Sequence, residues 1–174
     1  MRGRRHERHG DDRVRYKMRQ RLVSIGDDFW IEDDAGERVY KVDGKALRLR
    51  KTLVLEDPDG HELAKIREKV LRIKDAMEVE DAEGHRMAMV KKALVSPFRD
   101  RWSVEVEDGP DLDIKGNILD HEYTFTDGHT EVATVSKEWF RVADTYGVSV
   151  EPGQDPVLVL AATVALDMMV HEDR

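Results

Sequence analysis

Basic side chains that could bind an anionic partner are concentrated between residues 44 and 74, which hold nine lysines and arginines against five acidic residues. Alternation along a predicted strand over 45–50 turns Arg48 and Arg50 outward, and alternation along the next basic strand places three cations opposite Ile66. If these strands are neighbours, the patch would attract a phosphoinositide headgroup, an anionic membrane surface or an acidic segment of a partner protein. The alternative is an ordinary strand face partly neutralised by nearby glutamates. The predicted patch consists of Arg48, Arg50, Lys65, Arg67, Lys69, Arg72 and Lys74.

Three histidines, His61, His85 and His129, each directly follow a glycine of a predicted turn. They could be read as metal ligands, but they fall on separate turns without the spacing of a metal motif, so we interpret them as solvated turn residues. Motifs for a metalloprotease, a nucleophile elbow, a P-loop or a dinucleotide site are missing from the sequence. Carboxylate pairs are too abundant to single out an acid–base pair. We therefore expect no catalytic, cofactor or metal site.

A polar stripe interrupts the apolar segment near the end of the sequence. Thr163, Asp167 and His171 recur every four residues and would share one face of a helix. One interpretation makes Asp167 a proton or cation site inside the protein. The other places it at the mouth of a barrel, where it accepts hydrogen bonds from loop backbone or pairs with an arginine.

Short strands and their turns must position the basic patch and the turn histidines, because period-2 alternation dominates from Gln20 up to the apolar segment. In RWSVEVE (101–107), for example, Trp102, Val104 and Val106 share one face. Asp- and Gly-containing turns separate the strands, and Gly36, Gly60 and Gly84 stand 24 residues apart. This spacing predicts a meander of similar antiparallel hairpins.

The segment DPVLVLAATVALDMMV (155–170) predicts a helix, with Asp155 as its N-cap and Pro156 in its first turn. A helix that is apolar on nearly every side must be surrounded by lipid or by protein. Fifteen residues from Pro156 to Val170 span roughly 22 Å, whereas a bilayer core needs about 30 Å. We therefore expect the sheet to close around the helix.

Composition narrows the class of protein. The chain has 174 residues, a formal net charge of -8 and no cysteine, which excludes disulfides, iron–sulfur clusters and thiolate zinc sites. Residues 1–21 are strongly basic, with nine lysines and arginines against three acidic residues. We expect residues 1–17 to form a disordered basic tail able to bind polyanions weakly and without specificity, followed by one domain over residues 18–174. No apolar core of a secretory signal follows the basic residues.

Three segments in order resemble the LURP-one-related family of the tubby C-terminal-like superfamily: SIGDDFWIEDDAGERVYKVDGKALRLRKTLVLEDPDGHELAKI (24–66), VSKEWFRVADTYGVSV (135–150) and DPVLVLAATVALDMM (155–169). The resemblance implies a closed antiparallel β-barrel of about twelve strands that encloses the hydrophobic C-terminal helix. The superfamily also contains phosphoinositide-binding tubby proteins and phospholipid scramblases. Fold similarity does not transfer their activities.

We expect a non-enzymatic binding or scaffold domain in the cytoplasm or peripheral at a membrane, with anionic phospholipid or a protein as its partner and with no cofactor. Two alternatives stay open. Scramblase-like lipid transport would require the last helix to enter a bilayer, and an enzyme would require a catalytic arrangement that the sequence does not display.

Overall fold

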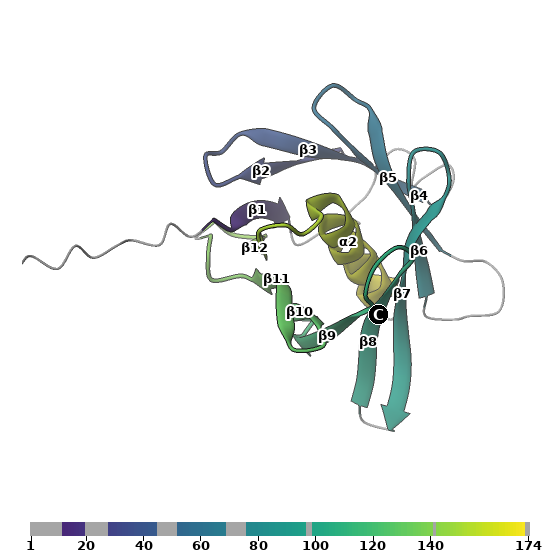
Figure 1. Ribbon diagram of the computed structural model, residues 1–174. Helices are drawn as coiled ribbons and strands as arrows, with labels where there is room; N and C mark the ends of the chain where they lie inside the picture. The colour runs from purple at the N-terminus through teal and green to yellow at the C-terminus, as the bar shows by residue number, and fades with distance from the viewer. Residues whose placement is uncertain are drawn as a thin grey trace, which may run out of the picture.

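The computed structural model describes residues 12–19, 28–44, 52–68, 76–96, 99–140 and 142–172, and its twelve strands form one closed barrel around a helix (Figure 1). Every strand pairs antiparallel with its sequence neighbours, and β1 closes the ring by pairing with β12. The strands are β1 (Val14–Arg19), β2 (Phe29–Asp33), β3 (Arg38–Asp43), β4 (Thr52–Glu56), β5 (Glu62–Glu68), β6 (Ala76–Glu80), β7 (Arg86–Ser96), β8 (Arg99–Val106), β9 (Leu112–Asn117), β10 (Glu122–Asp127), β11 (Thr130–Ser136) and β12 (Thr145–Val150). The predicted fold class is confirmed.

Strand β1 begins earlier than the sequence suggested. Val14 lies opposite Val150 and Arg19 opposite Thr145, so β1 uses its backbone to close the barrel. Tyr16 and Met18 alternate inward and are 6% and 0% exposed. The boundary of the predicted basic tail at residue 17 is therefore wrong, because backbone pairing and two inward side chains order this segment despite its surrounding charges. Residues 1–11, the rest of that predicted tail, lie outside the described residues.

Three hairpins repeat the same turn, which confirms the meander predicted from the 24-residue spacing. Asp33, Asp57 and Asp81 each accept, at Oδ1, the backbone N–H of the residue four positions later, at 2.8–2.9 Å. The glycines of these turns have φ of 79°, 88° and 88°, a region that favours glycine. Each hairpin also shifts its register between the two residues that precede the turn aspartate. The carboxylates that open these turns are therefore turn formers.

Helix α2 (Pro156–Glu172) fills the lumen and packs on β5, β6 and β7 (Figure 1). Its side chains from Val159 to Met169 are buried, including Thr163 and Asp167. Apolar surface meets apolar surface on every side, which explains why the sequence of this helix lacks a polar face. Among the described residues, no helix is long and apolar enough to cross a membrane.

The alternating strand directions place successive connections at alternate ends of the barrel. Five hairpin turns and the connection from β12 to α2 lie at one end, here called the turn end. All six connections are described; five of them contain acidic residues, and none of the six contains a lysine or arginine. The C-terminal half of α2 lies at the other end, here called the opposite end, near the connection from β9 to β10. The acidic residues of the turn end are Asp34, Glu37, Asp57, Asp59, Asp81, Glu83, Glu107, Asp108, Asp111, Glu151 and Asp155.

Candidate functional site

The predicted basic patch is described at two of its seven positions. Lys65 and Arg67 lie on the outer face of β5, while Ile66 between them is fully buried, as alternation predicts. Lys65 pairs with Glu62 at 3.0 Å, and Arg67 pairs with the nearly buried Glu80. Both described cations therefore have partners within the barrel. The single patch stays a prediction, since its other members, Arg48, Arg50, Lys69, Arg72 and Lys74, lie outside the described residues.

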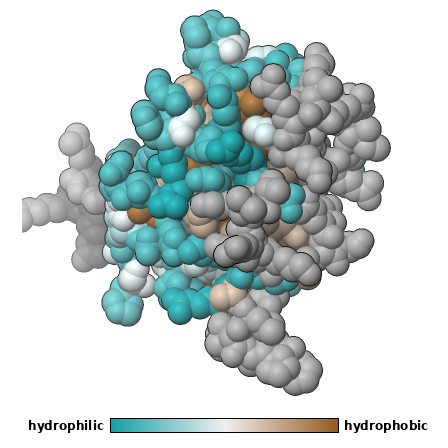
Figure 2. Space-filling view, turned by 90° about the vertical axis from the view of Figure 1, so that its right-hand side faces the viewer, coloured by the Kyte–Doolittle hydropathy of each residue, from teal (hydrophilic) through white to brown (hydrophobic). Residues whose placement is uncertain are grey.

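The face that includes β4 to β7, shown in Figure 2, is largely hydrophilic where residues are described, with small hydrophobic areas between the polar ones. This agrees with outward positions on β5 being charged and ion-paired. No extended apolar surface is visible on the described part of this face.

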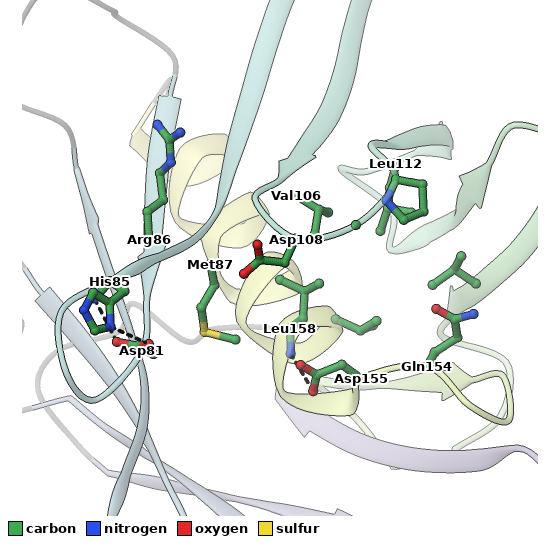
Figure 3. A pocket seen from close by; sticks show the side chains of 14 residues that line it. Asp81, His85, Arg86, Met87, Val106, Asp108, Leu112, Gln154, Asp155 and Leu158 are labelled. Carbon is green, nitrogen blue, oxygen red and sulfur yellow. Dashed lines mark hydrogen bonds and ion pairs between the residues drawn. The ribbon is translucent and has the colours of Figure 1, made fainter.

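A cavity of about 500 Å³ opens at the turn end, where α2 enters the barrel (Figure 3). Its volume falls in the range typical of small-molecule sites. The apolar lining comes from five elements that the barrel brings together: Met87 on β7, Val106 on β8, Leu112 on β9, Val132 on β11, and Leu158 and Val159 in the first turn of α2.

The first turn of α2 borders this cavity with its hydrogen bonds already satisfied. Asp155 is the N-cap, as predicted: its Oδ1 accepts the N–H groups of Val157 at 2.9 Å and Leu158 at 3.4 Å. Its backbone oxygen accepts the N–H of Val159 at 3.2 Å, and Pro156 has no N–H. The exposed donors that often bind anions at a helix start are therefore occupied here.

Charged residues form the rim of the cavity. Arg86 donates from Nε to Glu107 at 2.8 Å, and this bond raises the pKa of the guanidinium. His85 Nδ1 lies 3.3 Å from Asp81 Oδ2. Burial raises the pKa of Asp81, but the hydrogen bonds from His85 outweigh this effect and hold the pKa below its usual value. Asp81 is therefore ionised at neutral pH.

Asp108 differs from the other rim carboxylates, because no described residue donates to it or pairs with it. It extends from the β8–β9 turn over the space between Met87 and Leu158 (Figure 3). Arg86 points away from this carboxylate in the same view. Among the described residues, the rim thus presents one unpaired negative charge beside an apolar wall.

The three turn histidines, His61, His85 and His129, are exposed, as predicted. The side chains of His61 and His85 are 76% and 80% exposed, and each pairs with the aspartate that opens its turn. Asp57, Asp59 and His61 offer ligand atoms within 4.8 Å of one another, a grouping that the sequence analysis did not anticipate. The hydrogen bonds of the turn already account for this arrangement, because Asp57 accepts from Asp59 N, His61 N and the His61 ring.

A second polar cluster is enclosed inside the opposite end. Asp167 is 2% exposed, and its two oxygens lie 3.0 Å from His121 Nε2 and 2.6 Å from Tyr146 Oη. The His121 ring stacks on the Tyr146 ring with centroids 4.2 Å apart. Burial and the nearby Asp167 carboxylate raise the pKa values of Tyr146 and Tyr123, so both phenols stay protonated.

This cluster decides between the two interpretations of Asp167 in part. The carboxylate is enclosed inside the barrel, where the first interpretation placed it, and not at the mouth. It accepts hydrogen bonds, as the second interpretation held, but the side chains of a histidine and a tyrosine are hydrogen-bonded to it. The sequence analysis named neither residue, because only the register brings β12 and the Ile118–His121 turn onto this face of α2. Thr163 of the same stripe bonds to the Val159 carbonyl of its own helix at 2.8 Å.

Comparison with known proteins decides the family. The sequence profile described as LURP-one-related matches residues 14–167, which is most of the chain. The chain belongs to the LURP-one-related family. This LURP-one-related chain is 26% identical over 156 residues to the uncharacterized protein YxjI of Bacillus subtilis (strain 168), covering 90% of the chain and 93% of that protein. It is also similar to an X-ray structure of a protein from Arabidopsis thaliana, with a TM-score of 0.64, 19% identity and coverage of 93% of this chain and 92% of that one.

Sequence reasoning missed the cavity of this LURP-one-related barrel. It also missed His121 and Tyr146, which are hydrogen-bonded to Asp167. Met87, Val106 and Leu158 look like ordinary core residues in the sequence, and they meet at one opening only because the turns place them there. His121 and Tyr146 have no recognisable spacing with Asp167. A signal for the acidic turn end was present in the aspartates of successive turns.

Proposed function

We propose that this LURP-one-related protein is a non-enzymatic binding domain whose ligand site is the cavity at the turn end. The observation that carries the proposal is an opening of about 500 Å³ with an apolar wall and a charged rim. Such a site buries the apolar part of a small ligand and orients its polar part.

The composition of the lining supports binding over covalent catalysis. Its charged and polar members are Asp81, His85, Arg86, Asp108, Asp155 and Gln154. Among the described residues, it contains no serine, threonine, cysteine, lysine or tyrosine that could act as a nucleophile beside the Asp81–His85 pair. Asp155 caps the helix, and Arg86 is bonded to Glu107.

Binding of the neutral fluorophore N-phenyl-1-naphthylamine tests the site. We expect saturable fluorescence enhancement in the native protein and at least a tenfold loss of affinity in Leu158→Trp, because the larger ring fills the opening. Leu119→Trp is the matched control, since Leu119 is 55% exposed at the opposite end. Equal binding by all three proteins, each shown to be folded by its thermal transition, would refute the cavity as the site.

A second candidate function is docking of the opposite end to anionic phospholipid. The topology supports it. Strand β3 ends and β4 begins at the opposite end, and β5 ends and β6 begins there too. In the sequence, the two stretches between these strand pairs contain Arg48, Arg50, Lys69, Arg72 and Lys74. Positive charge concentrated at one end would orient the barrel toward a negative surface.

Liposome sedimentation tests this second proposal. We expect the protein to sediment with liposomes that contain a phosphoinositide, less so at high salt, and less so in the variant Arg48→Glu/Arg50→Glu. Asp34→Asn, at the turn end, is the control and should sediment like the native protein. Equal recovery with neutral liposomes at low salt would contradict docking through charge.

A further inference from the structure

The cavity at the turn end also carries information about the charge of its ligand. Its walls are apolar, so the ligand must bring an apolar group to Met87, Val106 and Leu158. The polar part of the ligand must then lie at the rim, where the charged residues are. The sign of the charge that the rim favours follows from which rim groups are already engaged.

Two groups that could bind an anion are occupied. The guanidinium of Arg86 lies 2.6–2.8 Å from Glu107 Oε2 and points away from Asp108 (Figure 3). The start of α2 is capped by Asp155, which accepts the N–H groups of Val157, Leu158 and Val159. An anionic ligand would have to break these bonds before it gained new ones.

Negative charge is available at the same rim. Asp108 has no partner among the described residues, and its carboxylate extends over the apolar wall (Figure 3). Three of the connections at the turn end line the opening. Five of the six connections at this end contain acidic residues and none contains a lysine or arginine, so the field of these connections attracts cations. Asp108 is exposed to solvent, so its attraction for a cation is sensitive to salt.

We propose that the ligand of this cavity is a small amphipathic cation, with its apolar group against Met87, Val106 and Leu158 and its ammonium or similar group beside Asp108. The inference rests on the proposed binding function of the cavity and deepens it by naming the ligand class. A hydrated inorganic cation alone would leave the apolar wall uncovered, and an anionic amphiphile would place its charge against Asp108.

Three probes with the same apolar part test the ligand class: 4-phenylbutylamine, which is cationic at neutral pH, 4-phenyl-1-butanol and 4-phenylbutyrate. Titrations by isothermal calorimetry at low salt should give the tightest binding for the amine, about tenfold weaker binding for the alcohol and the weakest for the carboxylate. The preference for the amine should shrink as salt is raised, because the rim is open to solvent.

Variants separate the charge from the wall. Asp108→Asn should bring the affinities for amine and alcohol within about twofold of each other while leaving the alcohol affinity unchanged. Asp34→Asn removes an acidic charge from the β2–β3 turn, which does not line the cavity, and should keep most of the preference. Leu158→Trp should abolish binding of all three probes.

The outcomes distinguish this inference from the proposed function. Saturable binding of the alcohol with no preference for the amine, tightest binding of the carboxylate, or a preference that survives Asp108→Asn would overturn the inference and leave the cavity as a binding site. Failure of all three probes and of the neutral fluorophore to bind the folded protein would overturn both.

Discussion

Asp167 is a carboxylate inside an apolar lumen, and side chains from different parts of the barrel bind it there. His121 approaches one oxygen, and Tyr146 donates to the other at 2.6 Å. A buried charge without partners costs several kcal/mol, so these bonds are what makes the position tolerable. They also fix α2 against β12 and the β9–β10 turn, because the three side chains must stay in register.

Replacement of Asp167 by Asn should therefore reduce stability. The amide has one acceptor oxygen where the carboxylate has two, so one of the two donors loses its partner. We expect a loss of about 2–3 kcal/mol and a fall in Tm of about 4–12 °C for a domain of this size, measured by calorimetry. The exposed control Asp34→Asn should melt like the native protein. An unchanged Tm in Asp167→Asn, combined with lost binding of a cavity probe, would instead assign Asp167 a role in ligand binding.

The turn pair Asp57–His61 makes a second prediction at this scale. The side-chain hydrogen bond to Asp57 raises the pKa of His61, and the backbone hydrogen bond from His61 lowers the pKa of Asp57. The contribution of the histidine is lost as pH rises through its raised pKa, and that of the aspartate is lost as pH falls through its lowered pKa. The pair therefore stabilises the turn between these two values.

Titration of the His61 ring by NMR measures this effect directly. The midpoint should lie above that of histidine in an unfolded peptide of the same sequence, and Asp57→Asn should lower it toward the peptide value. Because both groups are on the surface, high salt should reduce the shift as well. A His61 midpoint that is identical in Asp57→Asn and the native protein would contradict the pairing.

Among the elements, the hairpins show how far local sequence determines this fold. The spacing of Gly36, Gly60 and Gly84 predicts three turns of the same type, because a turn of this type needs a residue with positive φ at a fixed position. Asp155 and Pro156 predict the start of α2 for the same local reason. Features set within about five residues are thus readable from the sequence alone.

Other features depend on residues far apart in the chain, and sequence reasoning does not reach them. Trp139 and Phe140 look in the sequence like core residues of a closing strand, but they belong to the connection between β11 and β12. Their rings lie against Gly147, where an added Cβ would come within 2.7 Å of the Trp139 ring. Tyr146, by contrast, is a buried residue of β12. The cavity is hidden for the same reason, because its lining comes from distant elements.

The free-energy cost of a positive φ at a non-glycine residue can be measured in a hairpin turn of this barrel without a steric clash. Gly60 has φ of 88°, and a Cβ added there would meet no atom within 4 Å. Gly60→Ala should therefore destabilise the protein by about 1 kcal/mol through backbone strain alone, measured by urea unfolding. Gly60→Asn should cost less, since asparagine tolerates positive φ better. Equal stability of Gly60→Ala and the native protein would show that the turn relaxes.

At the scale of the whole molecule, the described connections of the turn end give that end an acidic character. The turn end carries carboxylates without a lysine or arginine in its six connections, and the stretches between β3 and β4 and between β5 and β6 are rich in basic residues in the sequence. The two proposed functions therefore use opposite ends. A cationic ligand at the turn end and an anionic surface at the opposite end would not compete for the same residues.

The basic residues that precede β1 give a prediction at this scale. Arg2, Arg4, Arg5 and Arg8 could hold a polyanion through release of its counterions, and Glu7 and Asp11 only partly offset them. Removal of residues 1–11 should lower the salt concentration at which the protein elutes from heparin. The deletion must end before β1, because Tyr16 and Met18 belong to the core. Unchanged elution with an unchanged Tm would refute a role for this segment.

The order of the elements along the chain has a consequence for biosynthesis. All twelve strands precede the helix that fills the barrel. The last strand ends at Val150, and the helix ends 22 residues later, at Glu172. At about 5–20 residues per second, a ribosome needs roughly 1–4 s to add them. During that interval the nascent sheet has inward apolar faces and nothing to cover them. The protein should therefore be most dependent on chaperones at this late stage of translation, and a premature stop between these residues should give an insoluble product.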